Sequence, residues 1–251
     1  MEEKDSVKSR LKDLADHSFS GNRFTFTGFL SMAELSEYYE IERELAYASP
    51  MVFGGSESCE RCMIRFGNPE ILGYEEDFPI VILEIKPVAM KFADDLNHRD
   101  FLGALMNLGI NRNTLGDIKI TGKSAILFCR DSMKDYIIEN LIKVKHTSIS
   151  INEISDVGEI GEVKTKEKVI QLSSARIDAV ISKAYNLSRN ASLELFRTGK
   201  VYLNGRECSE NAKTVVDNDI ISVRGYGKMQ FKACESVSRK GKLNCIISMF
   251  V

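Results

Sequence analysis

Three short segments of the sequence carry residue types that could perform chemistry. They are the pair Cys59 and Cys62, the triplet His98-Arg99-Asp100, and the glycine-containing segment 116–124, which ends in Lys-Ser. Paired cysteines can bind zinc or exchange disulfides, a histidine can act as a general base, and a glycine-rich loop can cradle phosphates. Each of these activities requires further residues at a defined spacing.

None of the three segments has the partners that its chemistry needs. The other cysteines and the histidines form no second close pair that would complete a zinc site. Cys59 and Cys62 precede an apolar run, which favours reduced cysteines at the start of a strand. Gly116 and Gly122 are separated by one residue too many for a phosphate loop. The triplet His98-Arg99-Asp100 is found in the catalytic loop of kinases, but the sequence has no glycine-rich nucleotide loop to accompany it. We therefore predict no catalytic residue, no metal and no cofactor.

The most informative pattern lies in the last third of the chain. Apolar residues at i, i+3, i+4 and i+7 predict a short helix over residues 176–185. Ser188 is a typical N-cap for a second helix. We expect that second helix to bury Ala191, Leu195 and Phe196.

A small sheet is predicted to follow the two helices. Gly199 suits the end of the second helix, residues 201–203 favour a strand, and Asn204-Gly205 favours a tight hairpin turn. A further strand is expected at residues 220–223. Beyond residue 227, alternating apolar residues predict strands that extend the same sheet.

Charge is distributed unevenly along the chain. Residues 172–251 contain 13 Lys or Arg and 7 Asp or Glu, a net charge of +6, whereas the whole chain has a net charge of −2. Residues 1–171 therefore carry a net charge of −8. A basic region with an exposed helix N-terminus can bind phosphates. A solvated helical face would have the same charge count.

The residue pattern of the basic region resembles the S-four RNA-binding domain. The resemblance spans residues 172–227 and rests on Arg176-Ile177-Asp178, on Gly-Lys-Val-x-x-Asn-Gly from Gly199, and on Asp-x-Ile-x-Val-Arg-Gly from Asp219. It implies that the helix pair and the following turn bind folded RNA. The positions that we expect to contact RNA are Arg176, Lys183, Arg189, Asn190, Arg197, Lys200, Asn204 and Arg224.

Upstream of this region, the sequence predicts two further domains, so that the fold class is α+β. Residues 76–160 have the order strand, helix, strand, strand, helix, strand, which is the βαββαβ plait of ferredoxin-like and RRM-like folds. Phe128 is the only aromatic residue in these four strands, which disfavours base stacking on this sheet. Residues 1–75 predict a small α+β domain with helices at 7–16 and 31–44 and strands at 46–53 and 62–66. The S-four domain occupies residues 172–251.

A longer segment resembles the YlmH family of bacterial RNA-binding proteins. It comprises residues 97–112 and 115–118 together with Phe53-Gly54-Gly55 and the C-terminal module. The resemblance implies a non-catalytic protein that engages ribosomal RNA of the large subunit and tRNA or peptidyl-tRNA, in rescue of stalled ribosomes. His98, Arg99 and Arg112 form a further candidate surface for RNA or a partner. Capping and pairing near the start of the helix would equally explain Arg99 and Asp100.

Two other classes of function remain compatible with the sequence. One is an RNA-modifying enzyme whose catalytic domain carries no recognisable motif, and the other is a scaffold associated with cell division. The sequence has no signal peptide and no apolar stretch long enough to span a bilayer, so we expect no membrane span and a cytoplasmic monomer.

Overall fold

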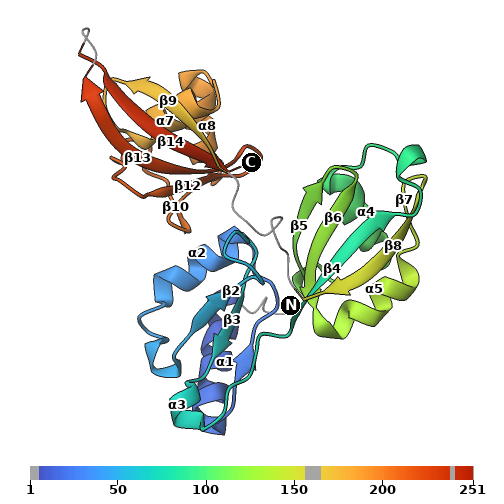
Figure 1. Cartoon of the computed structure of the whole chain (residues 1–251). Coiled ribbons are helices and arrows are strands. Elements are labelled where there is room, and N and C mark those ends of the chain that lie inside the picture. Colours follow the sequence, from blue (N-terminus) through green and yellow to red (C-terminus); the bar gives the residue numbers. More distant parts are fainter. Residues whose placement is uncertain (1–5, 156–164, 238–240, 251) are drawn as a thin grey trace, which may run out of the picture. The chain divides into compact units, whose positions relative to one another are not determined.

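The computed structural model describes residues 6–155, 165–237 and 241–250. The chain divides into two compact units, residues 1–162 and 163–251 (Figure 1). Among the described residues, the first unit contains a three-stranded and a five-stranded sheet, and the second unit contains a six-stranded sheet. Each unit has its own apolar core.

The first part of unit 1 is a small α+β layer. Its sheet has the order β1-β3-β2, with β1 at Thr25–Phe26, β2 at Met51–Phe53 and β3 at Met63–Phe66. The helices are α1 (Val7–Gly21), α2 (Met32–Ile41) and the short α3 (Pro69–Leu72). Ser31 and Glu34 form a capping box at the start of α2, which satisfies backbone donors that the helix leaves unpaired.

One predicted strand in this part is shorter than expected. Residues 46–48 form a 3-10 turn, η1 (Ala46–Ala48), and only Met51–Phe53 are extended. The turn ends at Ser49, whose φ of 48° lies in the left-handed region. Alanine has little preference for a strand, and packing of Ala48 in the core favours the turn. The prediction of a continuous strand over residues 46–53 was therefore wrong.

The second part of unit 1 is the predicted βαββαβ plait. The strands are β4 (Ile80–Pro87), β5 (Leu115–Thr121), β6 (Ser124–Arg130) and β8 (Thr147–Ile154), and the helices are α4 (His98–Asn107) and α5 (Lys134–Asn140). The strand order is β5-β6-β4-β8-β7, where β7 (Lys143–Val144) adds a short edge, and the paired strands are antiparallel. Short 3-10 turns occur at Met90–Phe92, Arg112–Thr114 and Asp131–Met133.

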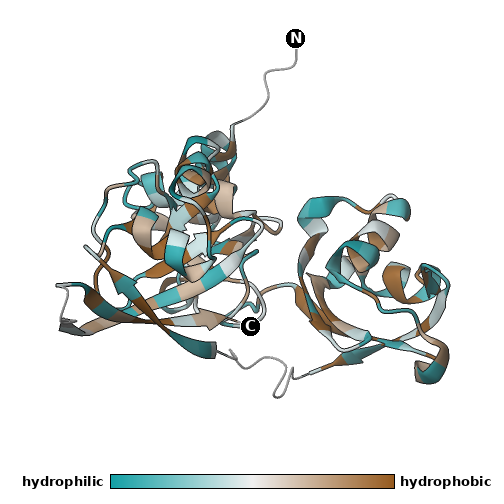
Figure 2. Cartoon of the chain, turned by 90° about the horizontal axis from the view of Figure 1, so that it is seen from above, coloured by the Kyte–Doolittle hydropathy of each residue, from teal (hydrophilic) through white to brown (hydrophobic). Residues whose placement is uncertain are grey.

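Strand alternation divides the five-stranded sheet into two apolar faces. Leu83, Ile85 and Leu127 pack with Phe101 of α4 and Ile137 of α5. The even-numbered residues of β4 and β6 lie on the other face of the sheet. There, Ile126 and Phe128 pack with Phe29, Cys59 and Met63. Because a strand points successive side chains to opposite faces, one sheet supports both the helices and the N-terminal layer. Figure 2 shows apolar residues gathered where helices meet the sheets.

Polar contacts also join the two parts of unit 1. Arg61 donates hydrogen bonds from Nε to the Leu115 carbonyl at 3.0 Å and from Nη2 to the carbonyls of Phe29 and Arg112. The backbone N–H groups of Glu60 and Arg61 donate to the Asp117 carboxylate. A Cβ at Gly116 would lie 2.7 Å from the ring of Phe29, so the close approach requires glycine.

Unit 2 has the predicted helix pair on one sheet. The sheet order is β11-β10-β12-β13-β14-β9. The strands are β9 (Thr165–Leu172), β10 (Val201–Leu203), β11 (Arg206–Glu207), β12 (Ile220–Val223), β13 (Gly227–Val237) and β14 (Leu243–Phe250). The unit begins before residue 172 because β9 pairs with β14 along its whole length.

The two helices of unit 2 are α7 (Ile177–Ala184) and α8 (Arg189–Arg197). Ser188 caps α8 as predicted, Gly199 adopts a φ of 60°, and Asn204 and Gly205 form a turn with positive φ. The prediction that α8 buries Ala191 was wrong, because Ala191 is exposed and Ser192 is fully buried instead. The Ser192 hydroxyl donates to the carbonyl of Asp178 at 2.9 Å, which satisfies a polar group in the helix interface.

A disulfide joins the two longest strands of unit 2. Cys234 in β13 is the cross-strand partner of Cys245 in β14, and the two residues form a disulfide. Their separation in sequence gives no signal of this pairing, which depends on the register of the two strands. Cys59 and Cys62, for which reduced cysteines were predicted, form no disulfide among the described residues.

Candidate nucleic-acid interface

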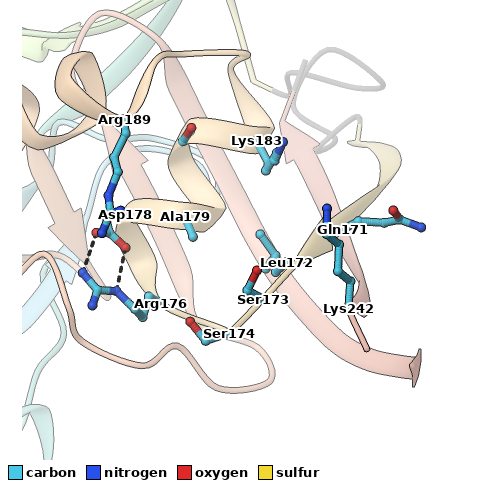
Figure 3. A pocket seen from close by; sticks show the side chains of 11 residues that line it. Gln171, Leu172, Ser173, Ser174, Arg176, Asp178, Ala179, Lys183, Arg189 and Lys242 are labelled. Carbon is cyan, nitrogen blue, oxygen red and sulfur yellow. Dashed lines mark hydrogen bonds and ion pairs between the residues drawn. The ribbon is translucent and has the colours of Figure 1, made fainter. Parts of the chain in front are cut away.

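A groove of about 520 Å³ lies beside α7 in unit 2 (Figure 3). The end of β9 with the following turn, both helices of the pair and the residue before β14 contribute to it. Its basic side chains are Arg176, Lys183, Arg189 and Lys242. Three of these four, Arg176, Lys183 and Arg189, are among the residues predicted to contact RNA, and the fold brings them to one groove.

Arg176 is held at the start of α7 by an ion pair. Its Nε and Nη2 donate to the two carboxylate oxygens of Asp178 at 3.1 and 2.7 Å. The Asp178 side chain is 5 % exposed, whereas that of Arg176 is 35 % exposed. Burial opposes ionisation of Asp178, but hydrogen bonds from Arg176 and Asn211 hold the pKa of this carboxyl below its ordinary value. The carboxylate therefore orients Arg176 and leaves part of its guanidinium at the surface.

Arg189 and Asn190 occupy the first turn of α8 and are exposed. Figure 3 shows the Arg189 side chain directed from α8 toward the Arg176–Asp178 pair. Ser188 accepts one backbone hydrogen bond from Ala191, and the remaining N–H groups of the first turn point away from the helix. This end of α8 therefore combines a cationic side chain with backbone donors, which suits an anionic oxygen.

The other predicted contacts lie outside the groove. Arg197 is in the last turn of α8 and pairs with Glu194 at 3.6 Å. Lys200 and Arg224 are neighbours at the ends of β10 and β12, since the Arg224 N–H donates to the Lys200 carbonyl at 2.8 Å. The Asn204 side chain bonds to Asp219 and to the Ile220 N–H, so it ties the turn after β10 to the start of β12. Arg197, Lys200 and Arg224 are exposed.

Sequence reasoning missed part of the groove. Gln171, Ser173, Ser174 and Lys242 line it beside the predicted residues. Gln171 lies near the end of β9, which pairs with β14, and Ser173 and Ser174 directly follow that strand. Lys242 lies far from α7 in the sequence. No local pattern marks these residues. The only available signal was the basic composition of residues 172–251.

In the second predicted surface, His98 lies near Arg112: partial burial and then the Arg112 charge lower the pKa of His98. Asn97 and Asp100 form a capping box at the start of α4, and Asp100 also pairs with Lys145 at 2.8 Å. Arg112 donates to the Leu115 carbonyl at 2.5 Å, and burial together with the nearby Arg61 charge lowers the pKa of Arg112 to about 10. His98 and Arg99 are exposed at the helix start. Asp100 therefore has the capping role, and Arg112 is turned toward its own backbone.

Two features are absent from the part of the chain that the structure describes. Across residues 6–155, 165–237 and 241–250, no group of three or more His, Cys, Asp or Glu side chains is placed to hold a metal ion. In the same part of the chain, no helix has both the length and the apolar composition required to cross a membrane.

Comparison with known proteins finds similarity in both sequence and structure. Residues 74–159 match the family model described as "Putative RNA-binding domain in YlmH", which covers the plait from β4 to β8. The chain is 28% identical over 191 residues to "Ribosome-associated protein quality control protein P2" of Bacillus subtilis (strain 168), and the match spans 75% of this chain and 73% of that protein. A solved structure titled "Cell division protein ylmH from Streptococcus pneumoniae" aligns with a TM-score of 0.46 and 18% identity over 59% of this chain and 88% of that one.

Proposed function

We propose that the chain is a member of the YlmH family and a ribosome-associated protein that binds RNA without catalysing a reaction. Its partners would be ribosomal RNA of the large subunit and tRNA or peptidyl-tRNA, in the rescue of stalled ribosomes. The printed name of the Bacillus subtilis relative supports the connection to ribosome-associated quality control. The cytoplasm is the compartment in which this role would be carried out.

The observation that carries this proposal is the basic groove of unit 2. Arg176, Lys183, Arg189 and Lys242 surround one cavity, and the first turn of α8 adds backbone donors. Phosphate oxygens bind to such donors, and the position of several phosphates relative to one another depends on the fold of the RNA. Recognition by shape therefore explains how this surface selects structured RNA without reading base edges.

Binding and positioning account for the proposed role without a chemical step. Asp178 is the most buried carboxylate at the groove, yet it is committed to Arg176 and Asn211. With the backbone N–H of Ala179 as a further donor, these hydrogen bonds occupy the lone pairs of both carboxylate oxygens, so Asp178 is not placed to take a proton from a substrate. The groove therefore has the properties of a binding surface.

The experiment that tests this function is co-sedimentation with purified large ribosomal subunits, either empty or carrying peptidyl-tRNA, across a salt series. Wild type should bind the tRNA-loaded subunit preferentially, and its affinity should fall steeply with salt. Arg189→Glu combined with Lys200→Glu should abolish most of the binding, because both residues are exposed on the RNA-facing side of the helix pair and turn.

A matched control separates a specific surface from overall charge. Arg23→Glu combined with Arg43→Glu changes the net charge by the same amount at two exposed arginines of unit 1, and this variant should bind as wild type does. Equal loss in both double variants would show that only net charge matters. Equal binding of wild type and the unit 2 variant, or no binding to either subunit, would contradict the proposed function.

A further inference from the structure

A second cavity, of about 440 Å³, lies in unit 1 on the face of the five-stranded sheet that α4 and α5 do not cover. Its walls include Met51 and Phe53 of β2, Arg65 of β3 and Phe78, which precedes β4. Glu75 and Asp77 stand at its rim and are exposed. We call this cavity the β2–β4 pocket. It is lined by residues that lie within the single compact unit 1.

Aromatic rings form one wall of the β2–β4 pocket. The rings of Phe53 and Phe78 are 5.5 Å apart and tilted by 58°, and Phe78 makes an edge contact with Phe26. Phe53 is 36% exposed and Met51 is 50% exposed, so the wall is open to a ligand. The four main strands of the plait contain only one aromatic residue, Phe128, which is buried, but the fold brings Phe53 and Phe78 beside them.

A buried arginine supplies a hydrogen-bond donor at the pocket. Arg65 is 6% exposed, and its guanidinium carbon lies 5.5 Å from the centre of the Phe78 ring. Its Nη1 donates to the Glu76 carbonyl at 2.7 Å, whereas Nε has no hydrogen-bond partner among the residues that the structure describes. A buried donor without an acceptor is costly, and a ligand that supplies the acceptor would be favoured.

The rim of the β2–β4 pocket is acidic, in contrast to the arginine inside it. Glu75 lies 3.7 Å from Nη1 of Arg65 as an ion pair, which leaves Asp77 as the rim carboxylate that a ligand donor would meet first. Unit 1 belongs to the acidic part of the chain, with a net charge of −8 over residues 1–171. Phosphate groups are therefore repelled from this opening. A neutral planar ligand that offers both donors and acceptors satisfies the rim carboxylates and the arginine together.

We propose that the β2–β4 pocket binds an unpaired guanine base of RNA. Guanine stacks on an aromatic wall through its π face, offers N1–H and N2–H donors to a carboxylate, and offers O6 and N7 acceptors to an arginine. Uracil has no exocyclic amino group for the rim carboxylates. The choice of a nucleobase rests on the RNA-binding function proposed above, while the pocket itself lies in the other unit.

Three alternatives fit the pocket less well. An RNA backbone would bring its phosphates against Glu75 and Asp77. A basic peptide side chain would suit the rim but would place a second cation beside Arg65, inside the pocket. An apolar peptide side chain would leave the Arg65 Nε without an acceptor. A single extruded base places its phosphate outside the rim and its polar edges inside.

Methyl NMR on the full chain, with labelled methionine methyl groups, tests the proposal. Met51 lines the pocket, while Met106 lies exposed on α4 and provides an internal reference. Titration with guanosine 5′-monophosphate should shift the Met51 resonance with a Kd on the order of 1 mM and leave Met106 unchanged. Uridine 5′-monophosphate should bind about tenfold more weakly, because its base offers a carboxylate only N3–H, whereas guanine offers N1–H and N2–H side by side.

Matched variants assign the binding to particular side chains. Phe53→Ala should weaken binding of guanosine 5′-monophosphate by about tenfold through loss of stacking, whereas Phe92→Ala should have no effect, because Phe92 is 83% exposed and does not line the pocket. Asp77→Asn, at an exposed position, should abolish the preference for the guanine nucleotide without affecting the fold.

The outcomes distinguish this proposal from the proposed function. Failure of the nucleotide to shift Met51, or equal weakening in Phe53→Ala and Phe92→Ala, would overturn the guanine site whatever the result of co-sedimentation. A shift of Met51 by tri-arginine peptide but not by the nucleotide would also overturn it and would assign the pocket to a protein. Nucleotide binding in a chain that does not bind ribosomal subunits would support the pocket and contradict only the ribosomal role.

Discussion

Two arginines of unit 1 and three arginines of unit 2 have opposite surroundings. In unit 1, Arg61 donates to three backbone carbonyls and Arg65 is buried between aromatic rings. In unit 2, Arg189, Arg197 and Arg224 are exposed. A guanidinium that bonds to carbonyls stabilises the fold, whereas one that faces solvent can bind phosphates. The number of arginines in a segment therefore does not measure its capacity for RNA binding.

This difference also predicts two modes of RNA binding in one chain. Unit 2 presents cations around an open groove, so its binding should weaken as salt increases. Unit 1 presents aromatic rings, an arginine and carboxylates to a base that carries no charge, so its binding to a base should change little with salt. Salt dependence thus provides a way to separate the contributions of the two units.

The largest effect that we expect within this comparison comes from Arg61→Ala. The substitution removes the guanidinium that links Phe29 to β5 and takes a donor from three carbonyls, although Leu115 keeps the Arg112 guanidinium and Arg112 keeps the Leu115 N–H. Unit 1 should be destabilised by about 3 kcal/mol. Peptide-resolved hydrogen exchange should show faster exchange in β3 and β5. Exchange in unit 2 should stay the same, because each unit has a separate core.

Arg99→Ala is the matched control for this substitution. Arg99 is exposed at the start of α4, so its loss should change the stability of unit 1 by less than about 0.5 kcal/mol. Equal exchange in the two variants would contradict a structural role for Arg61. Faster exchange in unit 2 of the Arg61→Ala variant would show that the units do not unfold independently.

A smaller effect is expected in unit 2 from Asp178→Asn. The carboxylate is 5 % exposed and accepts hydrogen bonds from Arg176 and Asn211, so its loss should cost about 2 kcal/mol at pH 7. Its pKa in the folded protein is lower than the unfolded value, which means that the ionised group stabilises the fold above about pH 4. That contribution is lost as the pH falls through the folded pKa.

The pH dependence gives this prediction a specific signature. The stability difference between wild type and Asp178→Asn should be constant from pH 7 to about pH 5 and should shrink below about pH 4, where the wild-type carboxyl becomes protonated. Denaturant unfolding followed by signals of unit 2 measures it. A difference that stays constant down to pH 2 would show that the ionised carboxylate is not the source of the stabilisation.

Much of the fold was predictable because its elements have clear periodicity. The plait of unit 1 and the helix pair of unit 2 were predicted from apolar spacing and caps, and the structure has both. The incorrect details are local. Ala191 was expected in the core because it is apolar, yet the helix register placed Ser192 there. A serine that donates to a backbone carbonyl is compatible with burial, and periodicity alone does not reveal such a partner.

The features that escaped prediction depend on contacts between distant segments. Lys242 reaches the groove because β14 pairs with β9, and Cys234 meets Cys245 because of the register of β13 and β14. The aromatic wall of the β2–β4 pocket combines Phe53 and Phe78, which lie outside the strands of the plait. Strand pairing over such distances has no local sequence signal. The predicted RNA contacts in unit 2, by contrast, lie on adjacent elements.

The smallest effects that we expect distinguish the groove from the wider basic surface of unit 2. Lys183 lines the groove, whereas Arg197 lies outside it and shares its charge with Glu194 at 3.6 Å. Lys183→Gln should therefore lower the slope of log affinity against log salt by about one, and Arg197→Gln should reduce affinity only about twofold. Glu194→Gln should raise affinity slightly, since it releases Arg197 from its partner.

Fluorescence anisotropy with a structured ribosomal RNA fragment measures the affinities of all three variants. A larger loss for Arg197→Gln than for Lys183→Gln would place the centre of RNA binding at the end of α8, because only a direct phosphate contact there would outweigh the exposed ion pair.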